Sequence, residues 1–85
     1  MKVQAFTKQN GKMVIQTIEA ENEEAACKQL FDIERESKNA VEIIAIRFSG
    51  NKIVTWNSTM AHYCWGEGQI SFLQFILNCI EMDKF

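Results

Sequence analysis

The sequence of 85 residues lacks proline altogether and has only four glycines and little low-complexity sequence. Linkers and disordered segments are commonly rich in such residues, so we predict one folded domain that spans residues 1–85. The hydrophobic share of 47% and the charged share of 24% are those of an ordinary globular protein. A chain this short buries only about 60–65% of its unfolded surface, so we expect a small margin of stability.

Cysteine is scarce as well. The three cysteines, Cys27, Cys64 and Cys79, are an odd number, and none belongs to a CxxC pair. This usage predicts a reduced, cytoplasmic protein. The N-terminal residues alternate between apolar and polar, unlike a signal peptide. The apolar stretch near the C-terminus is too short to span a bilayer and is interrupted by Gln74 and Asn78, so we expect no contact with a membrane.

The chain also lacks a basic surplus. Its net charge is −2, whereas dedicated nucleic-acid binders usually carry an excess of Lys and Arg. Residues 1–18 contain three lysines and no acidic residue, and residues 19–36 contain seven acidic residues against two basic ones. The first part of the chain is therefore basic, and the part that follows it is acidic.

An Asn-Gly pair separates two alternating runs, residues 3–8 and 13–20. Asn10-Gly11 predicts a β-hairpin, because a type I′ turn needs positive φ at both central residues. A two-residue loop fixes the pairs across the two strands: Phe6 with Ile15 on one face, and Val3 with Ile18 and Thr7 with Val14 on the other. Both faces are half apolar, so each must be covered, or one is kept for a partner.

The first helix is predicted over residues 23–36. Asn22 is a favourable N-cap, and Glu23 and Glu24 lie at the positive end of the helix dipole. Its apolar face is formed by residues at helical spacing: Ala26, Cys27, Leu30, Phe31 and Ile33.

Two further strands are predicted after this helix. Residues 41–48 are nearly continuously apolar and often β-branched, which is typical of an interior strand, and residues 52–56 return as a fourth strand. Residues 57–68 are ambiguous, because Ser58 could cap a short helix that ends at Gly66, or the segment could be an irregular loop. We predict the short helix.

The last predicted helix is unusually apolar. Eight of the eleven residues from 72 to 82 are apolar. The three polar ones, Gln74, Asn78 and Glu81, fall on one line of the helix together with Ser71. Ser71 and Gln74 form a capping box, so the helix should start just after Ser71. We expect it to be the larger core element, with its surplus apolar surface covered either by its own sheet or by a second copy of the chain.

The predicted element order is β-β-α-β-β-(short α)-α. This order indicates an α+β fold in which two main helices pack on a four-stranded, mainly antiparallel sheet.

Two groups of residues are candidates for contact with a partner. The first is acidic and lies on or next to the first helix: Glu21, Glu23, Glu24, Glu34 and Glu36. The second has the composition of an interface: Trp56, Met60, His62, Tyr63 and Trp65. The acidic residues could instead form a solvated helix face, and the two tryptophans could fill the core above the last helix.

Catalytic, cofactor and metal sites have no support in the sequence. His62 and Cys64 are two residues apart, a spacing that differs from the paired ligands of a Zn²⁺ site. On a helix, side chains two residues apart point away from each other, so the two residues are also unsuited to act as a catalytic pair. No glycine-rich phosphate loop and no suitable carboxylate pair occurs. We therefore predict a non-enzymatic protein without cofactor or metal.

The opening hairpin leads into Ile18-Glu19-Ala20-Glu21-Asn22-Glu23-Glu24-Ala25. This arrangement resembles the start of many short accessory proteins of phages and plasmids, and most of all the anti-CRISPR class of small inhibitors. The resemblance covers about a third of the chain and carries over no functional residue. It implies a compact, acidic protein that acts by binding rather than by catalysis.

These observations favour a protein-binding module that inhibits a nucleic-acid-processing complex through the acidic helix, the aromatic segment or both. Homodimerisation is a second expectation, because the chain has limited surface with which to cover both its sheet and its last helix. The alternative is a small nucleic-acid-binding regulator that uses the basic hairpins at Lys8, Lys12, Arg47 and Lys52. Stacking of bases on the aromatic segment is less favoured, because no Lys or Arg occurs between Lys52 and Glu67 to bind the phosphates.

Overall fold

The computed structural model describes residues 1–38 and 40–82. Its elements are, in chain order, β1 (Lys2–Gln9), β2 (Lys12–Glu19), α1 (Glu23–Glu36), β3 (Val41–Arg47), β4 (Ile53–Thr55), α2 (Ser58–Ala61), the π-helix η1 (His62–Gly66), α3 (Phe72–Leu77) and β5 (Glu81–Met82). The strands form one antiparallel sheet in the order β2-β1-β3-β4-β5. The predicted α+β class is confirmed, and the sheet has a fifth strand of two residues in addition to the four predicted.

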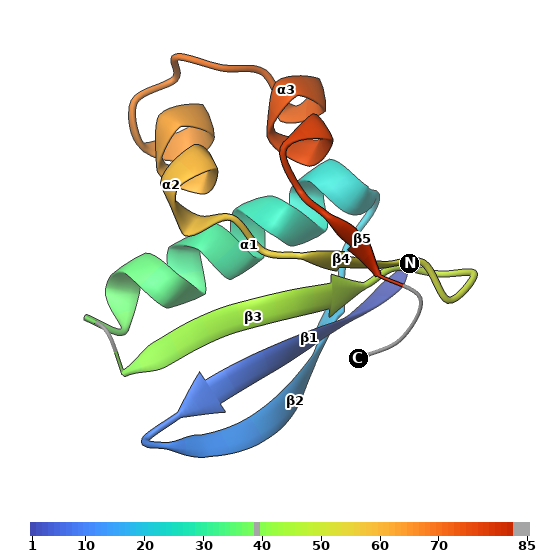
Figure 1. Ribbon diagram of the computed structural model, residues 1–85, viewed down its shortest axis with the longest axis vertical. Helices are drawn as coiled ribbons and strands as arrows, with labels where there is room; N and C mark the ends of the chain where they lie inside the picture. The colour runs from blue at the N-terminus through green and yellow to red at the C-terminus, as the bar shows by residue number, and fades with distance from the viewer. Residues whose placement is uncertain (39, 83–85) are drawn as a thin grey trace.

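The three α-helices lie on the same side of the sheet (Figure 1). The main core lies between them and the sheet, and it joins Val3, Ala5 and Ile18 of the hairpin to the buried side chains of the helices. The opposite face of the sheet carries a second, smaller cluster that contains no helical residue: Phe6, Ala45, Ile53 and Met82. One face of the sheet is therefore covered by helices. The other, here called the open face, carries no helix among the described residues, although the side chains of Phe6, Ala45 and Ile53 are buried there.

The opening hairpin has the predicted register. β1 and β2 pair without interruption from Lys2 with Glu19 to Gln9 with Lys12. Asn10 and Gly11 both have positive φ, at 52° and 82°, as a type I′ turn requires. The register between β1 and β3 shifts by one residue between Phe6 and Thr7, which leaves Ile44 as the extra residue of a β-bulge.

The first helix also follows its local signals. The side chain of Asn22 accepts a hydrogen bond from the backbone N–H of Ala25 at 2.8 Å, and α1 ends at Glu36 as predicted. The helix buries four residues against the sheet: Ala26, Cys27, Leu30 and Phe31. The second helix, α2, is capped by Asn57 rather than by the predicted Ser58. The side chain of Asn57 accepts a hydrogen bond from the backbone N–H of Met60 at 3.0 Å.

The last helix starts where predicted but ends early. The Ser71–Gln74 capping box is present, and α3 ends at Leu77 instead of continuing to residue 82. The backbone N–H groups of Asn78 and Cys79 bond to carbonyls three residues back, which tightens the chain into a turn. The backbone N–H of Thr55 then donates to the carbonyl of Ile80 at 2.8 Å, so the segment that follows joins the sheet as β5.

The expectation that the last helix is the larger core element is therefore wrong. α3 buries only Phe75, whereas α1 has 14 residues and buries four of them. Leu73 and Leu77 on α3, and Ile80 just after it, remain 66%, 74% and 70% exposed. The larger core element is α1, because its apolar face lies directly over the central strands.

Candidate functional site

Trp56 of the aromatic segment is buried in the core, and Trp65 packs half-buried against it. They join Phe31, Phe72 and Phe75 in an aromatic cluster that links α1, the end of β4, η1 and α3. The rings of Trp56 and Trp65 are stacked with centroids 6.4 Å apart, and Phe75 meets both of them edge-on at 5.1 and 4.9 Å. Trp56 is only 8% exposed, so it is not available as a contact for a partner.

Glu34 is half-buried, and hydrogen bonds within the fold hold its carboxylate. Its Oε2 accepts hydrogen bonds from the backbone N–H of Ile43 and from the hydroxyl of Ser58, both at 3.1 Å. Its Oε1 accepts from the indole N–H of Trp56 at 3.2 Å. Glu34 and Trp56 are both candidates for contact with a partner, and the structure joins them by a hydrogen bond. For Trp56 the alternative position in the core is the one that the structure has.

The other residues of the aromatic segment lie nearer the surface. Met60 packs half-buried against the core, whereas His62 and Tyr63 are exposed. His62 Nε2 lies 3.2 Å from Glu67 Oε2, so its nearest ionic partner is that carboxylate and not Cys64. His62 also lines a hollow of about 500 Å³ beside the C-terminal half of α1, whose lining includes two basic residues, Arg35 and Lys38, and two acidic ones, Glu34 and Glu42. The mixed charges of this hollow favour no ligand of one sign.

The remaining acidic candidates separate into two groups. Glu21, Glu23 and Glu24, here called the acidic cluster, surround the N-terminus of α1 and line a hollow of about 570 Å³ together with Met1, Asn22, Ser49 and Phe72. Glu36 is at the other end of the same helix, about 18 Å away at 1.5 Å per residue. A single contact with one small groove would therefore use the acidic cluster without Glu36.

Three large apolar side chains of the C-terminal segment are exposed, which the sequence pattern did not predict: Leu73, Leu77 and Ile80, here called the apolar strip. Phe72, the first residue of α3, lines the hollow of the acidic cluster, so the strip begins beside that cluster. Figure 1 shows α3 over the N-terminal end of α1, which agrees with this arrangement. The sequence does contain a sign of this exposure. The polar residues of the last segment form only a narrow line, so the segment has more apolar surface than one short helix can bury.

The basic residues of the alternative hypothesis are not gathered into one patch. Lys8 and Lys12 flank the hairpin turn, whereas Arg47 stands opposite Gln4, towards the other end of β1. Lys8 also stands opposite Glu42 in the sheet. The guanidinium of Arg47 lies 5.5 Å from the centre of the Phe6 ring, in a cation–π contact on the open face.

All three cysteines are free. Burial, followed by the neighbouring Cys79 and Glu23, raises the pKa of the Cys27 thiol far above its ordinary value of 9.0. Burial also raises the pKa of Cys79 and, together with Glu24, that of Cys64. A raised pKa lowers the thiolate fraction at neutral pH, so none of these thiols has the environment of an activated nucleophile.

We predict that the stability of the fold falls as the pH rises above about 9. There the unfolded chain loses the Cys27 proton while the folded chain keeps it, so the free energy of unfolding should decrease by about 1.4 kcal/mol per pH unit for this one group. Urea unfolding between pH 8 and 10.5 would measure the slope. Cys27→Ala should remove this part of the slope and Cys64→Ala should retain most of it; equal slopes in all three proteins would contradict the prediction.

Within residues 1–38 and 40–82, no helix is long and apolar enough to cross a membrane. The same residues include no group of three or more His, Cys, Asp and Glu side chains arranged to hold a metal ion. No protein-family model, curated protein or solved structure matches the chain. The fold and its surfaces define a small α+β domain with a five-stranded antiparallel sheet, one covered face and one open face.

Proposed function

We propose that this protein is a non-enzymatic binding module that docks on a partner protein through the acidic cluster and the apolar strip. The observation that carries the proposal is the exposure of Leu73, Leu77 and Ile80, at 66–74%, beside a group of three carboxylates. Interfaces between proteins commonly have an apolar centre and a charged rim, and exposed apolar patches on small domains often mark them.

The charge of the rim suggests the kind of partner. Glu21 and Glu24 are exposed and lie next to the positive end of α1 without a basic partner among the described residues. Carboxylates in this position would pair with Lys and Arg of a basic groove and would speed association at low salt. A groove that holds nucleic acid is such a surface, so the proposal includes inhibition of a nucleic-acid-processing complex, the activity typical of the anti-CRISPR class.

Affinity capture with matched variants tests this proposal. The double variant Glu21→Lys/Glu24→Lys should weaken binding of the captured partner at least about tenfold, and the loss should shrink as salt is added. Leu73→Ser/Leu77→Ser should weaken it as well, with little dependence on salt. The control Glu36→Lys/Glu42→Lys changes the net charge equally at exposed positions outside the acidic cluster and should bind normally.

The binding measurement would follow capture from a lysate, identification by mass spectrometry and titration against the purified partner. Melting curves of all variants would show that each one is folded. If both test variants bind as tightly as the control, the proposed surface is wrong. Salt-sensitive binding of DNA or RNA by the free protein, seen in a mobility-shift assay, would favour the basic hairpins instead.

A further inference from the structure

Among the residues that the structure describes, no strand pairs with the outer edge of β2. β2 is the terminal strand of the sheet and pairs over all eight residues with β1, without a bulge. Proteins usually protect such an edge with a proline, a central lysine, a bulge or a very short strand. In β2 the only charged residues are Lys12 and Glu19 at its two ends, and the opposite edge strand β5 has just two residues.

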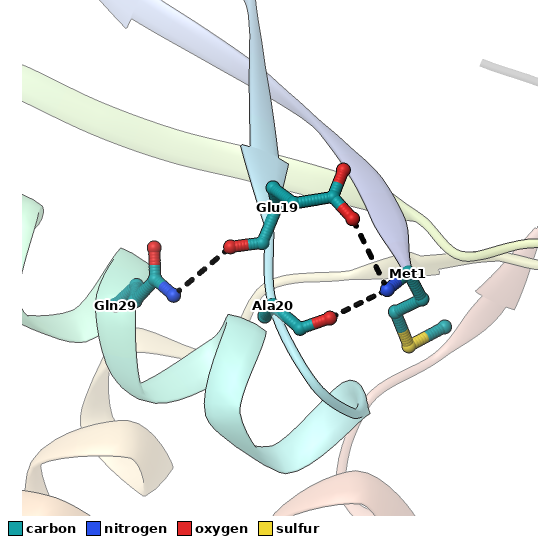
Figure 2. Close-up of polar contacts among 4 residues, drawn as sticks. All are labelled: Met1, Glu19, Ala20 and Gln29. Carbon is teal, nitrogen blue, oxygen red and sulfur yellow. Dashed lines mark hydrogen bonds and ion pairs between the residues drawn. The ribbon is translucent and has the colours of Figure 1, made fainter.

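The alternation of hydrogen bonds shows which backbone groups face outward. Met1 and Ala20 exchange both of their backbone hydrogen bonds, as Figure 2 shows in part. Residues in an antiparallel ladder alternate between bonded and non-bonded pairs, so Ile18, Gln16 and Val14 also direct their N–H and C=O groups to β1. The N–H and C=O groups of the intervening residues, Met13, Ile15 and Thr17, therefore point to the free edge.

The side chains along this edge are suited to contact with another strand. Met13 and Ile15 lie on the open face, on the same side as Phe6, and are 57% and 58% exposed. Val14 is on the other face and is 39% exposed. Large apolar side chains thus flank a row of unpaired backbone groups on both faces of the strand.

The charges at the ends of β2 identify the occupant. Lys8 and Lys12 lie at the turn of the hairpin, whereas Glu19 lies at the opposite end of β2. The side chain of Glu19 is 68% exposed, although one of its oxygens lies 3.4 Å from the Met1 amino group (Figure 2). An antiparallel second copy of β2 would set each basic end against an acidic end, and a two-fold axis would satisfy both ends at once.

We propose that β2 pairs with β2 of a second copy of this chain, in antiparallel orientation, to form one continuous sheet across a homodimer. A two-fold axis at Gln16 places Ile15 opposite Thr17 of the partner subunit and Met13 opposite the partner's Glu19. Each of these residues directs its backbone groups outward, so the pairs satisfy the requirement of a bonded ladder. The carbonyl of Glu19 already accepts a hydrogen bond from Gln29 Nε2 at 3.3 Å (Figure 2), and its second lone pair can accept another from the partner strand. This surface is separate from the acidic cluster and the apolar strip, so the inference stands independently of the proposed function.

Sedimentation equilibrium of the full chain tests the inference. The wild-type protein should sediment at twice its 9.8 kDa mass at tens of micromolar. Ile15→Lys places a charge in the middle of the exposed edge and should raise the dissociation constant at least about tenfold while the fold is kept. Leu77→Lys makes the same kind of change at the 74% exposed position on α3 and should leave the dimer intact.

Amide hydrogen exchange observed by NMR separates pairing at β2 from any other association. In the wild-type dimer the amides of Ile15 and Thr17 should be protected, and in Ile15→Lys the amide of Thr17 should exchange freely while that of Gln16 stays protected by β1. A wild-type monomer at 100 µM, on the order of the concentrations used for NMR, would overturn the inference. Loss of the dimer in Leu77→Lys but not in Ile15→Lys would do the same, because it would place the interface on α3.

Discussion

Replacing Phe75 by alanine should destabilise the protein by about 3–5 kcal/mol, the typical cost of removing a fully buried phenylalanine. Phe75 is completely buried and is the only residue of α3 that is. Its ring meets Trp56 and Trp65 edge-on, so its removal opens a cavity at the centre of the aromatic cluster. The loss is a large fraction of the stability of a small domain, and we expect α3 and η1 to lose their fixed packing first.

Urea unfolding followed by tryptophan fluorescence measures this effect, because both tryptophans of the chain contact Phe75. The matched control is Leu73→Ala on the same helix, where the side chain is 66% exposed and the change should stay within about 0.5 kcal/mol. If Phe75→Ala leaves too little folded protein to titrate, the milder variant Phe75→Leu should still be less stable than Leu73→Ala. Equal stability of the Phe75 and Leu73 variants would show that α3 is not anchored by this residue.

Replacing Glu34 by alanine should cost about 2–4 kcal/mol, since hydrogen bonds to a charged group contribute about 1.5–3 kcal/mol and their loss leaves donors unpaired. The carboxylate accepts from the backbone of Ile43 on β3, the indole of Trp56 and the hydroxyl of Ser58. It therefore connects α1 to the sheet and to the start of α2. Glu34→Gln should lose less, because one oxygen is retained as an acceptor.

The control for this prediction is Glu36→Ala, on the same helix two residues later. Glu36 is exposed, and the described residues provide it with no hydrogen bond or ion pair, so its removal should change the stability by less than about 0.5 kcal/mol. Thermal and urea unfolding would compare the three variants with the wild type. A Glu34→Ala variant as stable as Glu36→Ala would mean that water replaces the carboxylate at no cost.

The two predictions also explain why a sequence pattern is a poor guide to a contact surface. Glu34 lies within a run of acidic residues, and Trp56 lies within a run of aromatic ones. Composition gave each the features of a partner contact, yet the fold brings them together across 22 positions of the chain and uses the carboxylate to satisfy the indole. Of the candidates, the acidic cluster, Glu36, His62 and Tyr63 remain at the surface, and the apolar strip joins them there.

The sequence by itself determined the features whose physical cause lies within a few residues. Asn10-Gly11 set the hairpin register because its two positive φ values fit only one turn, and Asn22 and the Ser71–Gln74 pair set the starts of two helices because the capping atoms are three residues apart. The buried face of α1 also followed from the sequence, because the helical spacing of its apolar residues is a local pattern.

Only the tertiary structure decided the features that depend on distant segments. The last helix stops at Leu77 because β4 offers Thr55 as a hydrogen-bonding partner for Ile80, and no periodicity within residues 72–82 contains that information. The open face of the sheet likewise depends on distant segments, because it exists only since all the helices pack on the other side. Local patterns fix turns and caps, whereas competition between distant partners decides which apolar and acidic side chains remain at the surface.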